Sequence, residues 1–114
     1  MNELDREWLK DMLESAKEAV ALLGERSVAE LDADRRTLLA VSLALQTVGE
    51  AASRVSLQGR SVVTGVAWEK IVGMRHRLVH GYRTRSTAIV FATVKEHLPP
   101  LILALEAAGV EDTP

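Results

Sequence analysis

Apolar residues recur at three- and four-residue steps through the first part of the chain. The recurring positions are Leu4, Trp8, Met12, Ala16, Ala19 and Leu23. This spacing matches the 3.6-residue turn of an α-helix that buries one face. Asn2 is of a type that caps helix starts, and Gly24 is of the type that most often follows a helix end. The pattern therefore predicts an amphipathic helix between Asn2 and Gly24.

The next stretch predicts a short turn and then a long central helix. Ser27 and Glu30 have the spacing of a capping box. Asp32 or Asp34 can cap a second helix that runs to about Leu57. We therefore expect this helix to cross most of the length of the fold.

The middle of the long helix, residues 38–48, is apolar on nearly every side, which predicts an element covered from several directions. Gly49, Ala51 and Ala52 follow it. Glycine inside a helix costs about 1 kcal/mol relative to alanine, so a compensating reason is needed. We expect a neighbouring helix to approach closely there, and Gly59 to end the long helix.

Two further helices are predicted in the second half of the chain. Residues 58–65 are polar and punctuated by glycine, which predicts a loop. Apolar positions from Trp68 to Val79 predict a third, shorter helix that stops near Gly81. Ser86 or Thr87 can cap a fourth helix, which Pro99 and Pro100 should kink or split. The expected fold is an all-α antiparallel bundle of four main helices in one domain, residues 1–114.

Composition agrees with helices packed on helices. Hydrophobic residues make up 47% of the chain and aromatic residues 4%, where a β-rich protein normally carries more aromatics. The chain has no cysteine, which excludes disulfides, thiol nucleophiles and cysteine metal sites and fits a reducing compartment. We find no apolar signal core near the start and no stretch of roughly 20 apolar residues. A soluble, cytoplasmic protein without membrane contact is expected.

The net charge of −2 hides an uneven distribution. Residues 1–34 contain ten acidic and four basic side chains, a balance of −6. Residues 54–85 contain seven basic side chains and one acidic side chain, a balance of +6. The second half of the chain is therefore suited to meet an anion such as nucleic acid. The alternative is that the two segments neutralise each other within the fold.

Titratable side chains concentrate near the end of the third predicted helix. His76 and His80 share a helix face, with Glu69 close to the same line. These three residues suggest a metal site, but the HExxH arrangement is absent and the neighbouring arginines would repel a divalent cation. The two histidines can also be plain surface residues, and His97 is expected to be structural.

A third interpretation rests on Arg75, His80 and Tyr82, which have the spacing Arg-x4-His-x-Tyr. The segment that contains them, residues 68–82, resembles the HEPN superfamily and, within it, the HepT-like toxins. The residue after the arginine of that motif is polar, here His76. The spacing alone is weak, and its place in the third helix beside Tyr82 makes the resemblance specific.

The resemblance also covers segments outside the motif. Residues 49–54 at the end of the second helix and residues 98–101 in the fourth resemble HepT-like proteins as well. The resemblance therefore covers nearly the whole chain.

The resemblance implies a metal-independent endoribonuclease without a cofactor that acts on RNA as a homodimer. His80 would serve as base and acid when the 2′-hydroxyl of RNA attacks the adjacent phosphate, and Arg75 would stabilise the phosphorane. Base and acid stand on opposite sides of an in-line displacement, so two copies of His80 would face each other across a dimer cleft. Arg75 and His80 lie about 140° apart on an ideal helix, so helix distortion or the dimer must bring them together.

The resemblance also implies regulation at Tyr82. In HepT-like systems a nucleotidyltransferase antitoxin of the MntA type adds AMP groups to this tyrosine, and negative phosphates beside a basic cleft would repel RNA. Without the resemblance, Tyr82 can be read as an amphipathic residue that packs at the helix end.

The remaining candidate residues are supporting ones. Glu50 is spaced for an ion pair with Arg54 and can alternatively orient Arg75. His76 is a second supporting candidate. Further candidates for phosphate contacts, or simply for solubilising charge, are Arg77, Arg83 and Arg85.

Two functions follow as hypotheses. The first is an RNA-cleaving toxin held in check by its antitoxin. The second is a bundle without catalysis that binds a nucleotide, a nucleic acid or a nucleotidyltransferase partner.

Overall fold

The computed structural model of the chain describes residues 1–80 and 87–111, with the side chains of all these residues except 75–80. In chain order its elements are α1 (Glu3–Leu23), α2 (Val28–Ala33), α3 (Arg35–Arg54), α4 (Leu57–Val62), α5 (Trp68–His80), α6 (Thr87–Ala92), the π-helical turn η1 (Thr93–His97) and α7 (Leu98–Ala107). These described ranges contain no β-strand, so the all-helical prediction is confirmed.

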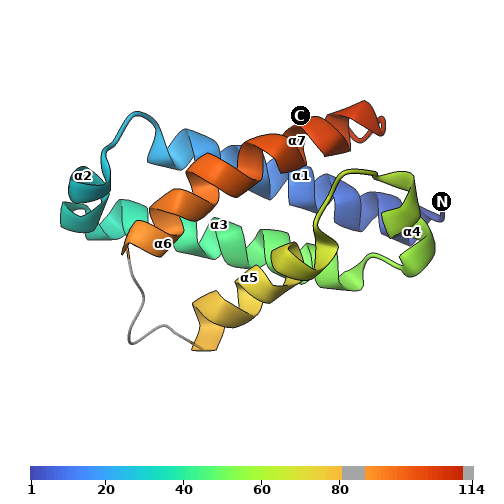
Figure 1. Cartoon of the computed structure of the whole chain (residues 1–114), viewed down its shortest axis with the longest axis horizontal. Helices are drawn as coiled ribbons and strands as arrows, with labels where there is room; N and C mark the ends of the chain where they lie inside the picture. The colour runs from blue at the N-terminus through green and yellow to red at the C-terminus, as the bar shows by residue number, and fades with distance from the viewer. Residues whose placement is uncertain (81–86, 112–114) are drawn as a thin grey trace.

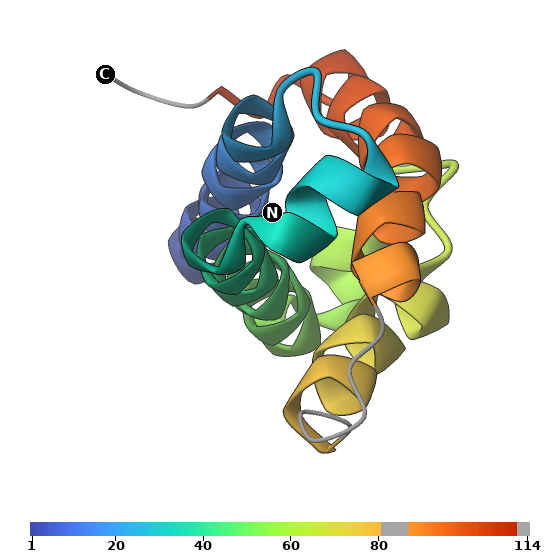
Figure 2. The same ribbon diagram turned by 90° about the vertical axis from the view of Figure 1, so that its left-hand side faces the viewer.

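The four main helical runs form the predicted antiparallel bundle. Helices α1 and α3 lie side by side, α7 packs along α1, and α5 packs along α3 (Figure 1). The short helices α2 and α4 lie at opposite ends of the bundle, where they connect the long helices. Viewed along the bundle, α5 occupies an outer edge (Figure 2).

The helix caps predicted in the first half of the chain are formed, whereas Ser86, a candidate cap of the fourth helix, lies outside the described residues. Asn2 Oδ1 accepts a hydrogen bond from the Asp5 N–H at 2.7 Å and starts α1, while Gly24 follows its end with a positive φ of 57°. Ser27 and Glu30 make both hydrogen bonds of a capping box. At the start of α3, Asp34 rather than Asp32 is the cap.

One apolar position of α1 was assigned to the wrong face. Met12, Ala16 and other predicted core positions are buried, but Leu4 is 63% exposed. Asp5 takes the inward position of the first turn and is only 2% exposed. Its carboxylate accepts hydrogen bonds from the Ser56 N–H at 2.9 Å and the Ser56 hydroxyl at 2.5 Å, which compensates for its burial.

The polar segment after α3 is helical where a loop was predicted. Helix α3 ends at Arg54, somewhat before the predicted Leu57, and α4 begins after Ser56, whose hydroxyl accepts from the Gly59 N–H at 3.1 Å. Gly59 is buried inside α4, where a Cβ atom would lie 2.7 Å from Asp5 Oδ2. This glycine is therefore explained by the close approach of α1 and not by the end of the long helix.

The central helix α3 is covered on fewer sides than predicted. Val41, Leu45 and Val48 are fully buried, and the small residues from Gly49 to Ala52 include buried positions, as expected for close packing. However, Leu39 is 46% exposed and Leu43 is 64% exposed. One side of α3 therefore faces solvent in the isolated chain.

The two prolines interrupt the last helical run as predicted. Pro99 and Pro100 have no N–H, so the carbonyls of Lys95 and Glu96 lack the partners they would have in an α-helix, and each proline ring crowds the carbonyl four residues earlier. The chain responds with the wider π-helical turn η1 directly before them. The backbone remains helical on both sides of this turn.

The run Thr87–Ala107 is long and apolar enough to cross a membrane by length and composition alone. The prediction that no stretch reaches this length is therefore wrong by this measure. Several of its apolar side chains belong to the core of the bundle, namely Val90, Val94, Leu98, Leu101 and Leu105. Burial against the other helices gives those residues a role that needs no membrane.

Candidate functional site

Helix α5 carries the predicted catalytic motif. Its backbone is helical from Trp68 to His80, which confirms the predicted third helix up to the motif histidine. Positions 75 and 80 therefore lie on one helix, separated by about 7.5 Å along the axis and about 140° around it. The side chains of Arg75, His76, Arg77 and His80, and all of Tyr82, Arg83 and Arg85, lie outside the described residues, so their roles stay predictions.

Helix α5 is held mainly by α3. Ile71 and Met74, one turn apart, are buried in the common core, and Trp68 and Val72 pack against it. The apolar face predicted from the spacing of the segment is thus confirmed over its first half. This packing attaches the first half of α5 to the body of the bundle.

Glu50 forms the predicted ion pair within α3. Its Oε1 atom lies 3.0 Å from Nε of Arg54, one helical turn away. The guanidinium of Arg54 also lies over the ring of Trp8, 5.4 Å from its centre, which ties this pair to α1. The second interpretation, that Glu50 orients Arg75, involves a side chain outside the described ones and stays a prediction.

Sequence reasoning missed the role of Arg60, which it counted only as part of the basic segment. The Arg60 guanidinium donates to the backbone oxygens of Val55 at 3.1 Å and Ala52 at 3.3 Å, and it lies over the Trp68 ring at 5.4 Å. Its partners lie five and eight residues before it and eight residues after it, a combination with no standard sequence spacing. Only the folded arrangement brings them together.

Three carboxylates whose pKa is lowered, Asp5, Glu30 and Asp34, hold the fold together. Hydrogen bonds from the Ser56 hydroxyl and N–H lower the pKa of Asp5. The Thr37 hydroxyl and N–H lower the pKa of Asp34, and the Ser27 N–H and hydroxyl lower the pKa of Glu30. In each case the hydrogen bonds favour the charged carboxylate over its protonated form. These groups cap helices or join them, and they are not candidates for acid–base chemistry.

Ion pairs among the described side chains bear on the uneven charge. Lys17 lies 3.1 Å from Glu106, Arg26 lies 3.2 Å from Asp34, and Arg54 pairs with Glu50. None of these three pairs joins an acidic residue of segment 1–34 to a basic residue of segment 54–85. They therefore give no support to the alternative in which the two segments neutralise each other.

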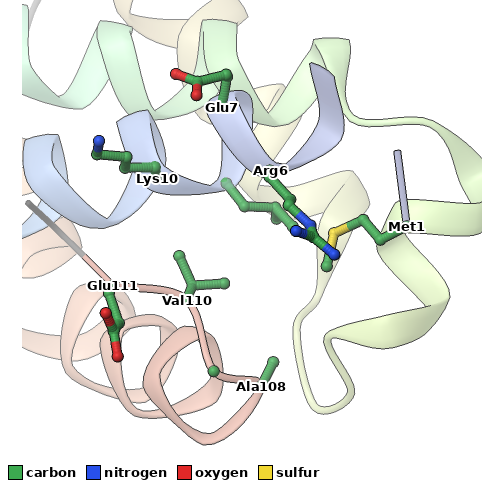
Figure 3. A pocket seen from close by; sticks show the side chains of 9 residues that line it. Met1, Arg6, Glu7, Lys10, Ala108, Val110 and Glu111 are labelled. Carbon is green, nitrogen blue, oxygen red and sulfur yellow. The ribbon is translucent and has the colours of Figure 1, made fainter. Parts of the chain in front are cut away.

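A hollow of about 300 Å³ lies between the start of α1 and the residues that follow α7. Figure 3 shows Arg6 and Lys10 from α1 on one side and Ala108, Val110 and the neighbouring Glu111 on the other. Its charged side chains are of both signs, because Glu7 also lines it. It shares no residue with α5 and is not part of the candidate site.

A smaller hollow of about 110 Å³ lies at the opposite end of α5 from His80. Lys70 and Ile71 line it from α5, and Glu96, His97 and Leu101 line it from the last helical run. His97 is exposed on η1, away from the motif, so the hollow does not extend the catalytic candidate. No group of three or more histidine, aspartate and glutamate side chains among the described residues is arranged to hold a metal ion.

The regions of this chain that match known proteins include both the helical bundle and the motif segment. The profile of the family described as "Ribonuclease HepT-like" matches residues 12–108. A protein of Thermococcus cleftensis described as "Probable ribonuclease HepT" is 32% identical over 96 residues, which cover 81% of this chain and 87% of that protein. A protein of Methanocaldococcus jannaschii described as a "Putative RNase" is 29% identical over 94 residues, with 82% and 86% covered. No solved structure matches at comparable significance.

Proposed function

This chain belongs to the HepT-like family of ribonucleases, and we propose that it is a metal-independent endoribonuclease toxin whose catalytic residues are Arg75 and His80. The observation that carries the proposal is a single helix, α5, that contains the whole Arg-x4-His spacing inside the part of the chain matched by the family. The residue types suit RNA cleavage, which needs proton transfer and stabilisation of negative charge.

The proposed reaction is a transesterification within the RNA. Neutral His80 takes the proton of the 2′-hydroxyl, and the freed oxygen attacks the adjacent phosphorus. Arg75 donates hydrogen bonds to the oxygens of the phosphorane, where negative charge accumulates. A protonated histidine then gives its proton to the departing 5′-oxygen. The products are a 2′,3′-cyclic phosphate and a 5′-hydroxyl, so atoms and protons balance without an added cofactor.

The second histidine in this proposal is His80 of the partner subunit. Attack and departure occur on opposite sides of the phosphorus, and one imidazole cannot reach both sides in a single step. The position of α5 at an outer edge of the bundle supports a homodimer formed through this helix, because a second copy can approach there (Figure 2). Two copies of the motif would then line one basic cleft.

The other motif residues take supporting roles in the proposal. His76 and Glu50 assist the catalytic pair. The guanidinium groups of Arg77, Arg83 and Arg85 hold RNA phosphates without reading the sequence. Tyr82 is the site at which a nucleotidyltransferase antitoxin adds AMP, so that negative charge blocks the cleft. The toxin acts in the cytoplasm, where RNA and the antitoxin are both present.

The test is RNA cleavage by the purified protein in EDTA. His80→Ala and Arg75→Ala should abolish cleavage, while the wild type leaves 2′,3′-cyclic phosphate ends. His97→Ala and Arg36→Ala are matched controls, because both residues are exposed and belong to elements other than α5. They should cleave RNA at the wild-type rate. Intact RNA that remains bound to the wild type would instead support the binding module without catalysis.

A further inference from the structure

Arg60 joins three segments that are separate in sequence. Its Nε atom donates to the carbonyl of Val55 and its Nη2 atom donates to the carbonyl of Ala52, so it caps the C-terminal end of α3. The same guanidinium lies 5.4 Å from the centre of the Trp68 ring, on the first residue of α5. Arg60 itself belongs to α4 and is only partly exposed.

Among the described side chains, the attachments of helix α5 lie towards its N-terminal end. Its main packing partner is α3, and its described buried residues, Ile71 and Met74, both lie in its first half. The Arg60–Trp68 contact is therefore a second point of attachment at the N-terminal end of the helix. Two attachments, the core packing of Ile71 and Met74 and the Arg60–Trp68 contact, restrain the orientation of α5 as well as its position.

We propose that Arg60 is a positioning residue that sets the direction of α5 relative to α3 and so places the catalytic motif. The inference rests on the proposed function, because the orientation of α5 matters for the reaction only if its motif is catalytic. From the packing at residues 71–74 to position 80 the helix extends about 10 Å. A rotation of about 6° there moves the motif histidine by about 1 Å, and an error of that size can lower a rate about a hundredfold.

The fold contains a matched residue for comparison. Arg26 donates to the carbonyls of Leu22 at 3.0 Å and Leu23 at 3.2 Å, at the end of α1, and its Nε atom pairs with Asp34. Arg26 thus caps the end of α1 as Arg60 caps the end of α3, and its partners among the described residues lie on α1 and at the start of α3. Replacement of either residue removes two bonds to helix carbonyls, and only replacement of Arg60 releases α5.

The experiment compares Arg60→Met, Arg60→Lys and Arg26→Met with the wild type in RNA cleavage. For Arg60→Met we expect kcat to fall between about tenfold and a hundredfold while KM changes by less than about twofold. Arg60→Lys should recover part of kcat, because the ammonium keeps the contact with Trp68 but lacks the fork of donors. Arg26→Met should keep kcat within about twofold of the wild type. Equal losses of kcat in Arg60→Met and Arg26→Met would overturn the proposal.

Two readouts do not depend on cleavage. Amide hydrogen exchange should accelerate in residues 68–80 of Arg60→Met and not in those of Arg26→Met. Trp8 and Trp68 are the two tryptophans of the chain, so a Trp8→Phe background makes Trp68 the single reporter. Its emission should shift to longer wavelength when Arg60 is replaced. If the wild type fails to cleave RNA, the proposed function fails, and these two measurements still decide the role of Arg60.

A direct role of Arg60 in RNA binding would give a different result. Loss of a phosphate contact raises KM and lowers the salt dependence of binding by about one unit of slope. An unchanged salt slope together with a lower kcat supports positioning. A higher KM with unchanged kcat and unchanged hydrogen exchange in α5 would refute it.

Discussion

Replacing Gly59 with alanine places a methyl group in the contact between α4 and α1. The new Cβ would lie 2.7 Å from Asp5 Oδ2 and 2.9 Å from Val55 Cγ1, whereas ordinary contacts begin at 3.4 Å. The carboxylate of Asp5 would therefore need to move by about 0.7 Å, the difference between 3.4 and 2.7 Å. It is poorly free to do so, because it is buried and both its oxygens accept hydrogen bonds from Ser56.

The expected cost follows from two opposing effects. Extra volume in a packed contact destabilises a protein by about 1–3 kcal/mol. Alanine also favours a helix over glycine by about 1 kcal/mol at most, which offsets part of that cost. We expect Gly59→Ala to lower the free energy of unfolding by about 1–2 kcal/mol. For a chain of this size the melting temperature should then fall by about 4–10 °C.

Gly73→Ala is the matched control for this substitution. Gly73 also lies within a helix, α5, but among the described residues no atom beyond its chain neighbours and the backbone of its own helix lies within 4 Å of its ideal Cβ position. This variant should be more stable than the wild type by about 0.5–1 kcal/mol. Urea and thermal unfolding followed by circular dichroism measure both variants at one protein concentration, since dimerisation makes stability concentration-dependent. If Gly59→Ala is as stable as Gly73→Ala, the inferred steric conflict with Asp5 does not exist.

Two further predictions concern pH and salt. Because hydrogen bonds from Ser56 lower the pKa of Asp5 in the folded state below its ordinary value of 3.8, this group stabilises the fold above that value, and the contribution is lost as the pH falls through the lower folded pKa. Asp5→Asn should therefore unfold with less dependence on pH in this acidic range than the wild type, and identical pH profiles would contradict the role of the Asp5–Ser56 contact. For salt, the apparent affinity for RNA should fall as ionic strength rises, and Arg77→Ala or Arg83→Ala should each reduce the slope by about one unit in a filter-binding titration. Unchanged slopes would remove these arginines from the RNA-binding surface.

Local sequence patterns were sufficient wherever the decisive contacts span only a few residues. The Asn2, Ser27 and Asp34 caps each bond to an N–H three residues later, so they could be recognised from the sequence. The spacing of apolar residues likewise predicted the long helices and α5. The motif spacing on α5 was readable for the same reason, since Arg75 and His80 lie five positions apart.

The sequence pattern did not predict helix α4, because the contacts that stabilise this helix come from a distant part of the chain. The polar segment with Gly59 has the composition of a loop. What favours its helical packing is the contact of Ser56 and Gly59 with Asp5, 51 residues before Ser56. The same long-range contact explains why Asp5, and not Leu4, is turned inward.

By itself the amino-acid sequence determined the helical class, most helix starts and the position of the Arg-x4-His motif, because these depend on interactions within one or two helical turns. Only the tertiary structure decided which apolar residues stay exposed, as Leu43 does, and which groups each arginine contacts. Those outcomes depend on how helices distant in sequence pack together, and a pattern along the chain does not specify which surfaces meet. Arg60 is therefore one basic residue among several in the sequence, and in the fold it contacts both the end of α3 and the first residue of α5.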